Sequence, residues 1–239
     1  MTFVAAKCPE CAGALQVPDD RDTVKCMYCG VDVIVRQAIQ LVAGNAKHFL
    51  ALAGSALSAR NFSEAFNYFT RTLEIEPTNA DAWLGKGTTA GWQSTLEEFR
   101  FLEMMVAYEN AIKFAKAESL ETMKLSCAGN LTNLATAYHK KSREHMLEYV
   151  ALPNTWQEYI SRCRQCISLY EVAHGYRPKE SKIIEAIINL CKDNIEGVKY
   201  KDPRNSDRSR VVVLTDNYEN GLRKMLSAYA EKMLSLIHI

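Results

Sequence analysis

Residues 61–77 read Asn-Phe-Ser-Glu-Ala-Phe-Asn-Tyr-Phe-Thr-Arg-Thr-Leu-Glu-Ile-Glu-Pro, and this stretch decides the fold of most of the chain. Its apolar and small residues recur every three or four positions, which is the period of one face of an α-helix. Pro77 cannot continue a helix, so we expect the helix to end just before it. A helical hairpin is predicted, because a turn at Arg60-Asn61 separates this helix from an earlier stretch with the same spacing, formed by Phe49, Leu52, Ala53 and Ala56.

A second hairpin is predicted from residue 80 onward. Its first helix carries Trp83, which lies 34 residues after Phe49 and occupies the position equivalent to Phe49 in the first hairpin. The stretch Glu103–Ile112 matches a second helix but comes five residues later than a strict repeat would place it. We therefore expect an insertion near residues 91–96, and a capping box at the start of the next helix made by Ser94 and Glu97.

The two hairpins resemble tetratricopeptide repeats over residues 46–79 and 80–118, through their aromatic openings, their small contact residues and Pro77. The resemblance implies an α-helical-hairpin solenoid whose first helices line a concave, partner-binding face. Members of the family that clamp a peptide carboxylate carry Lys, Asn and Arg there. The matching positions in this chain are mostly apolar or small, so we expect an amphipathic helix or peptide of a partner protein, or the chain's own C-terminal helix, to dock instead. These positions are Lys47, Leu50, Gly54, Leu57, Asp81, Leu84, Thr88 and Gly91.

The rest of the chain shows helical periodicity without a clear repeat. Helices are predicted over about 119–149, from Asn154 onward, over 180–197 and over 209–236, with a capping box formed by Asn154 and Gln157. The polar, proline-containing stretch 200–208 is predicted to be a loop. Residues 37–239 are thus expected to form one helical domain, with these helices pairing as two more hairpins.

Four cysteines near the N-terminus are spaced as metal ligands. Cys8 and Cys11 form one Cys-x-x-Cys pair, and Cys26 and Cys29 form another after fourteen residues. Two residues between thiolates let both sulfurs of a turn face one ion, and two such turns supply the four ligands of a tetrahedral zinc site. Short alternating stretches at 14–17, 23–25 and 31–35 predict strands around the two turns. The open alternative is a set of free or redox-active thiols without metal.

This segment resembles the zinc ribbon family over residues 6–36, through the four cysteines, Pro9, Gly30 and the strand at 31–35. Ala12 stands where these ribbons usually have glycine. The resemblance implies a small β zinc ribbon at residues 1–36 that binds one Zn²⁺. Because all four ligands are cysteines, no coordination position is left for water or substrate, so the zinc is expected to be structural. The predicted fold class is mainly α, with this ribbon followed by the helical hairpins.

Other reactive residues are better explained by packing. A third Cys-x-x-Cys, Cys163 and Cys166, lies on the apolar stripe of a predicted helix, as do Cys127 and Cys191. Buried free cysteines behave as small apolar residues, so we expect all four in the core rather than in a redox or second metal site. The sequence lacks a glycine-rich phosphate loop, a GxSxG motif and an HExxH motif. No enzymatic activity is therefore predicted.

Composition narrows the class of partner. Lys plus Arg (29) nearly balances Asp plus Glu (28), for a net charge of +1, and residues 1–40 carry four basic against five acidic side chains. Nucleic-acid binding needs a basic surface, so it is disfavoured. No signal peptide or transmembrane segment is predicted, and paired cysteines without one favour a cytoplasmic location. We expect a non-enzymatic, zinc-binding protein-interaction scaffold. A nucleic-acid-associated regulator that uses the ribbon, or a thiol redox switch that releases zinc, are the alternatives; the partner and the oligomeric state are not predicted.

Overall fold

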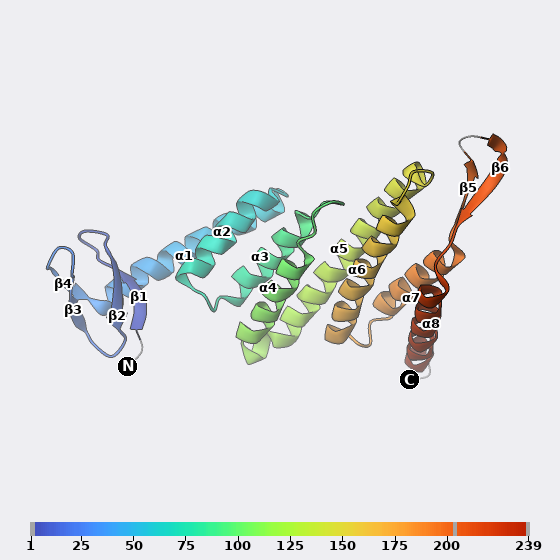
Figure 1. Cartoon of the computed structure of the whole chain (residues 1–239). Helices are drawn as coiled ribbons and strands as arrows, with labels where there is room; N and C mark the ends of the chain where they lie inside the picture. The colour runs from blue at the N-terminus through green and yellow to red at the C-terminus, as the bar shows by residue number, and fades with distance from the viewer. Residues whose placement is uncertain (1–2, 203–204, 238–239) are drawn as a thin grey trace. The chain divides into compact units, whose positions relative to one another are not determined.

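The computed structural model describes residues 3–202 and 205–237 (Figure 1). It confirms the predicted fold class, because short antiparallel strand pairs at the N-terminus are followed by a body of helical hairpins. The described elements are, in order, β1 (Phe3–Lys7), β2 (Ala14–Pro18), β3 (Thr23–Lys25), β4 (Asp32–Ile34), α1 (Val35–Ser58), α2 (Phe62–Ile75), α3 (Ala80–Trp92), α4 (Phe101–Phe114), the 3-10 helix η1 (Ala117–Ser119), α5 (Leu120–Tyr149), α6 (Thr155–Tyr176), α7 (Ser181–Glu196), β5 (Val198–Asp202), β6 (Asn205–Val212) and α8 (Asp216–Ile237).

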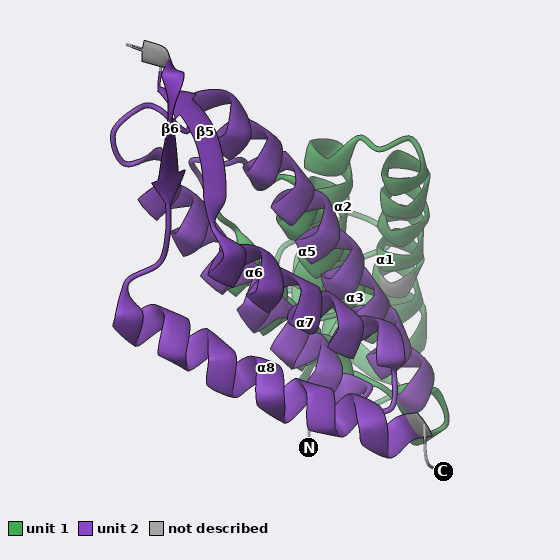
Figure 2. Cartoon of the chain, turned by 90° about the vertical axis from the view of Figure 1, so that its right-hand side faces the viewer, with its two compact units in different colours: residues 1–94, 99–120 green, residues 95–98, 121–239 purple. Residues whose placement is uncertain are grey.

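The chain divides into two compact units (Figure 2). The first holds the described residues up to Ser94 together with Phe99–Leu120, and the second holds Thr95–Glu98 and the described residues from Glu121 onward. The predicted boundary between a ribbon and a helical domain at residue 36 stays a prediction.

The N-terminal strands form two antiparallel pairs within the first unit. β1 pairs with β2 so that Phe3 faces Pro18, and β3 pairs with β4 so that Thr23 faces Ile34. The sequence predicted β2, β3 and β4 but missed β1. Their shared core is small and includes residues of the first turns of α1; its buried members are Ala6, Cys8, Leu15, Val17, Cys26, Val33, Val35 and Ala38.

Two helical hairpins make up the rest of the first unit. α1 packs on α2, α3 packs on α4, and α2 lies against α3. The first turn forms as predicted: Arg60 adopts a left-handed φ of 58°, and the Asn61 side chain accepts a hydrogen bond from the Glu64 backbone N–H at 3.4 Å. Glycines let the helices approach closely, since a Cβ at Gly85 would overlap the ring of Phe69 and one at Gly87 would lie 2.7 Å from the ring of Tyr108.

The predicted insertion after α3 is present, but its capping box is wrong. α3 ends at Trp92 and α4 begins at Phe101, with Arg100 at the N-cap and no side-chain cap. The Ser94 hydroxyl oxygen instead accepts a hydrogen bond from the Arg100 backbone N–H at 3.0 Å. The connecting segment forms its own turn, so Ser94 lies too far ahead of the helix to cap it.

The second unit contains the largest departure from the sequence prediction. β5 and β6 form an antiparallel hairpin where a loop over 200–208 and a helix from residue 209 were expected. Gly197 ends α7 with φ 68°, and a Cβ there would overlap the carbonyl oxygen of Val212. The hairpin forms because Gly197 turns the chain sharply and because Val198, Tyr200, Val211 and Val212 favour extended backbone.

The remaining helices of the second unit follow the prediction closely, apart from one cap. Asn154 precedes α6 with φ 67° and makes no side-chain cap hydrogen bond, so its predicted capping box with Gln157 is wrong. In the left-handed conformation the Asn154 side chain is not in the geometry of an N-cap. Within the described part of the chain, none of the helices is both long and apolar enough to cross a lipid bilayer.

Candidate metal centre

The strand pairs place the four N-terminal cysteines in two matching turns. Cys8 directly follows β1 and Cys26 directly follows β3, while Cys11 and Cys29 close the turns. In the first turn the Ala12 N–H donates to the Cys8 carbonyl at 2.9 Å, and in the second the Gly30 N–H donates to the Cys26 carbonyl at 2.9 Å. The same backbone geometry therefore presents both cysteine pairs.

The four sulfurs converge on one point. All four Sγ atoms lie within 4.8 Å of one another. The Sγ atoms of Cys8 and Cys29 are 3.7 Å apart, and so are those of Cys11 and Cys26. Zinc–sulfur bonds of about 2.3 Å in a tetrahedron separate the sulfurs by about 3.8 Å, which is close to the observed spacing. The four cysteines can therefore hold one metal ion.

The second turn favours the thiolate of Cys26, whereas burial and hydrogen bonds with the neighbouring thiols raise the pKa of Cys11 and of Cys29. The backbone N–H groups of Cys29 and Tyr28 point at the Cys26 sulfur and lower the pKa of this thiol to about 6; the Tyr28 nitrogen lies 3.4 Å from it. Metal binding requires deprotonated cysteines, so this preorganised N–H environment assists coordination. Cys8 and Cys26 are buried, while Cys11 and Cys29 are exposed, so one side of the centre faces solvent.

Ala12 adopts the left-handed backbone conformation in the first turn that Gly30 adopts in the second turn. Its φ of 59° matches the 75° of Gly30, but a left-handed backbone costs a residue with a Cβ roughly 1–2 kcal/mol. We expect Ala12→Gly to tighten zinc binding about fivefold, which corresponds to about 1 kcal/mol. The matched variant Gly30→Ala should weaken it by a similar factor, since no atom lies within 4 Å of the added Cβ and only the backbone conformation is penalised. Competition titration with a chromogenic chelator measures both; equal affinities for the three proteins would contradict the prediction.

The other cysteines lie in the core of the second unit, as the sequence analysis expected. Cys127, Cys163, Cys166 and Cys191 are all buried and free of disulfides. Burial raises the pKa of Cys163 and of Cys191 to about 11 and that of Cys127 to about 12, and it also raises the pKa of Cys166. Thiols of this kind stay protonated at neutral pH, which makes them poor nucleophiles and poor metal ligands.

The predicted partner-binding residues lie on two neighbouring helices of the first unit, α1 and α3. Their spacing puts each set on one face of its helix. Lys47, Gly54 and Asp81 are exposed, whereas Leu50, Leu57 and Leu84 are half-buried. Thr88 is buried and its hydroxyl lies 3.0 Å from the Tyr108 hydroxyl, so it offers little surface to a partner. Gly91 is buried as well.

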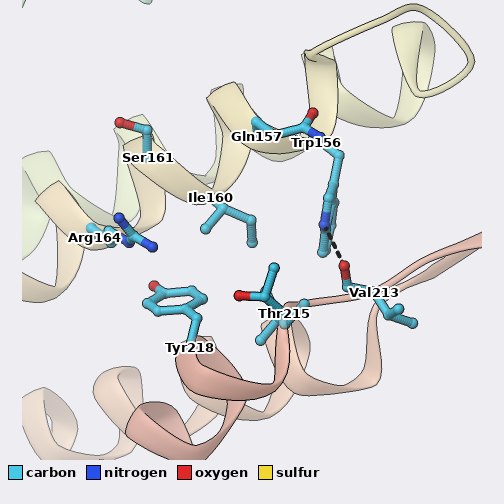
Figure 3. Close-up of a pocket in the computed structure, with 9 residues that line it drawn as sticks. Trp156, Gln157, Ile160, Ser161, Arg164, Val213, Thr215 and Tyr218 are labelled. Atoms are coloured by element: carbon cyan, nitrogen blue, oxygen red, sulfur yellow. Dashed lines mark hydrogen bonds between the residues drawn. The ribbon is translucent and has the colours of Figure 1, made fainter.

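The structure also contains a pocket that the sequence analysis missed. It lies in the second unit between α6 and the segment that joins β6 to α8 (Figure 3). Its walls come from residues that are far apart in the sequence, such as Trp156 and Val213, which are 57 positions apart, so no local sequence pattern indicates the pocket.

No family model matches the chain, and no curated protein matches it. A solved structure described as that of MamA protein is similar to this chain, with 14% sequence identity over 81% of this chain and 92% of that chain, and a TM-score of 0.28.

Proposed function

We propose that this chain is a non-enzymatic protein-interaction scaffold whose N-terminal segment is a zinc ribbon and whose first two hairpins are tetratricopeptide-like. The observation that carries the proposal is the convergence of four cysteine sulfurs beside a stack of helical hairpins. A complete set of four thiolates leaves zinc without an open position, so the metal stabilises the fold instead of reacting.

Zinc fits this centre better than other common metals. Tetrahedral sites made of four sulfurs select zinc or iron–sulfur chemistry, whereas calcium, magnesium and manganese prefer oxygen ligands. The spacing between the sulfurs matches that around a single ion with zinc–sulfur bond lengths. When bound, zinc would be held by Cys8, Cys11, Cys26 and Cys29.

The docking face is formed by the aligned residues of α1 and α3. Half-buried leucines at 50, 57 and 84 offer apolar contacts, and exposed Lys47 and Asp81 offer charged ones. A helix that docks on such a surface uses an apolar stripe flanked by polar residues. Gly54 lies among these residues and is exposed, so a side chain added there would project toward a bound partner.

Affinity capture with paired variants tests the docking face. Gly54→Lys places a long charged side chain on the face, whereas Ser55→Lys places the same side chain at the adjacent exposed position of α1, about 100° around the helix. We expect Gly54→Lys to reduce recovery of the captured partner by about tenfold or more, because an apolar interface rejects an unpaired charge. Ser55→Lys should retain the partner. Equal recovery with both variants would contradict the assignment of the face.

A further inference from the structure

The pocket of the second unit has a volume of about 260 Å³. One wall is a face of α6, and the other is the segment from Val213 to Tyr218, which leads into α8. Pockets for drug-sized ligands span about 300–1,000 Å³. The space here therefore suits a smaller group, about the size of one amino-acid residue.

Three side chains make the pocket apolar. Trp156, Ile160 and Leu214 line it and are each between 7% and 8% exposed. The Trp156 indole N–H donates a hydrogen bond of 3.0 Å to the carbonyl oxygen of Val213, which ties the two walls together (Figure 3). The apolar surface is thus held in place by a contact between the walls and is available to an apolar group of a ligand.

Arg164 supplies the one charge among the residues that line the pocket. Its guanidinium carbon lies 4.2 Å from the centre of the Tyr218 ring, and no acidic side chain of the described residues forms an ion pair with it. The guanidinium points into the space between the walls (Figure 3). Arg164 is exposed, and a guanidinium over an aromatic ring keeps N–H groups free to donate to a carboxylate.

Tyr218 adds a second polar group. Its phenol oxygen is shielded from solvent, and the Arg164 guanidinium lies close enough to donate a hydrogen bond to it. The hydroxyl proton still has no acceptor among the described residues, and a bound acceptor would recover the free energy of that missing hydrogen bond. Figure 3 shows this oxygen on the side of the ring that faces Arg164.

We propose that this pocket binds a carboxylate attached to an apolar group of about one residue in size. The carboxylate accepts hydrogen bonds from the Arg164 guanidinium and the Tyr218 hydroxyl, and the apolar group packs on Trp156, Ile160 and Leu214. The same chemistry occurs in the C-terminal residue of a peptide and in a short monocarboxylic acid. This site is independent of the docking face on α1 and α3, so either assignment can fail without the other.

Titration of the intact, zinc-loaded chain, followed by the NMR signal of the Trp156 indole N–H, tests the site. The probes are N-acetyl-leucine, its uncharged amide and octanoate, and Trp156→Phe identifies the signal among the three tryptophans. We expect a saturable shift with at least one of the two acids, and binding of the amide weaker by about tenfold or more, because a charge-assisted hydrogen bond is lost. Binding of N-acetyl-leucine alone identifies a peptide terminus as the source, and binding of octanoate alone identifies a fatty monocarboxylate.

Three variants separate the site from general charge effects. Arg164→Gln and Tyr218→Phe each remove one proposed donor while keeping most of the side chain, and both should weaken binding of the acid. Arg223→Gln removes an exposed arginine from α8 that does not line the pocket, and should bind the acid as the parent does. The proposal is overturned if neither acid shifts the Trp156 signal at millimolar concentration, if acid and amide bind equally, or if Arg164→Gln binds as tightly as the parent.

Discussion

Removal of zinc should unfold residues 3–34 and leave most of the helices intact. This segment consists of two-stranded sheets, which are marginal alone, around a small core that includes Cys8 and Cys26 themselves. Units shorter than about 40 residues usually need a metal or disulfides to fold. Amide hydrogen exchange, measured before and after chelation, should show loss of protection in β1–β4 and in the first turns of α1, which share that core.

The circular dichroism signal of the helices serves as the companion measurement. It should fall only slightly on chelation, and added zinc should restore the protection of the strands. Cys26→Ser should bind zinc at least 100-fold more weakly, since even the loss of a partner outside the ligand set costs 10–100-fold. Cys191→Ala removes a buried thiol elsewhere and should leave zinc content unchanged. Collapse of most of the helical signal on chelation would contradict the independence of the hairpins from the metal.

Gly85→Ala should destabilise the first unit although alanine is the better helix former. A Cβ at this position overlaps the ring of Phe69, which is buried between α2 and α3 and cannot move aside freely. Overpacking of this kind costs about 1–3 kcal/mol, which outweighs the gain of about 1 kcal/mol in helix propensity. Urea unfolding should therefore give a lower free energy of unfolding for the variant.

Gly44→Ala is the matched control for this prediction. Gly44 lies in α1, is exposed and has no atom within 4 Å of an added Cβ. The substitution should raise the free energy of unfolding by up to about 1 kcal/mol. Replacing Phe69 by leucine in the Gly85→Ala background should recover part of the loss, because the smaller side chain makes room. Stabilisation by both alanine variants would show that α2 and α3 do not meet as closely as described.

The features that the sequence predicted correctly depend on local patterns. The two residues between the cysteines of each pair are enough to predict a turn there. The stretch 61–77 has the apolar spacing of a helix, with a start signal at Asn61 and a stop signal at Pro77. Such patterns depend on residues a few positions apart, so they can be recognised in the sequence without knowledge of the tertiary fold.

The features that were missed depend on distant partners. β5 was missed because Lys199 and Lys201 make the segment look polar, and only its pairing with β6 identifies it as a strand. β1 was missed because only its pairing with β2 distinguishes it from an irregular N-terminal segment. The pocket beside Arg164 was missed because the packing of α6 against the segment before α8 creates it.

X-ray absorption at the zinc edge, combined with metal analysis of the purified, reduced chain, tests the central assignment most directly. The proposed function predicts one zinc ion per chain with four sulfur ligands at about 2.3 Å. A centre that needs nitrogen or oxygen ligands to fit the spectrum, that contains iron in place of zinc, or that retains no zinc under reducing conditions would contradict it.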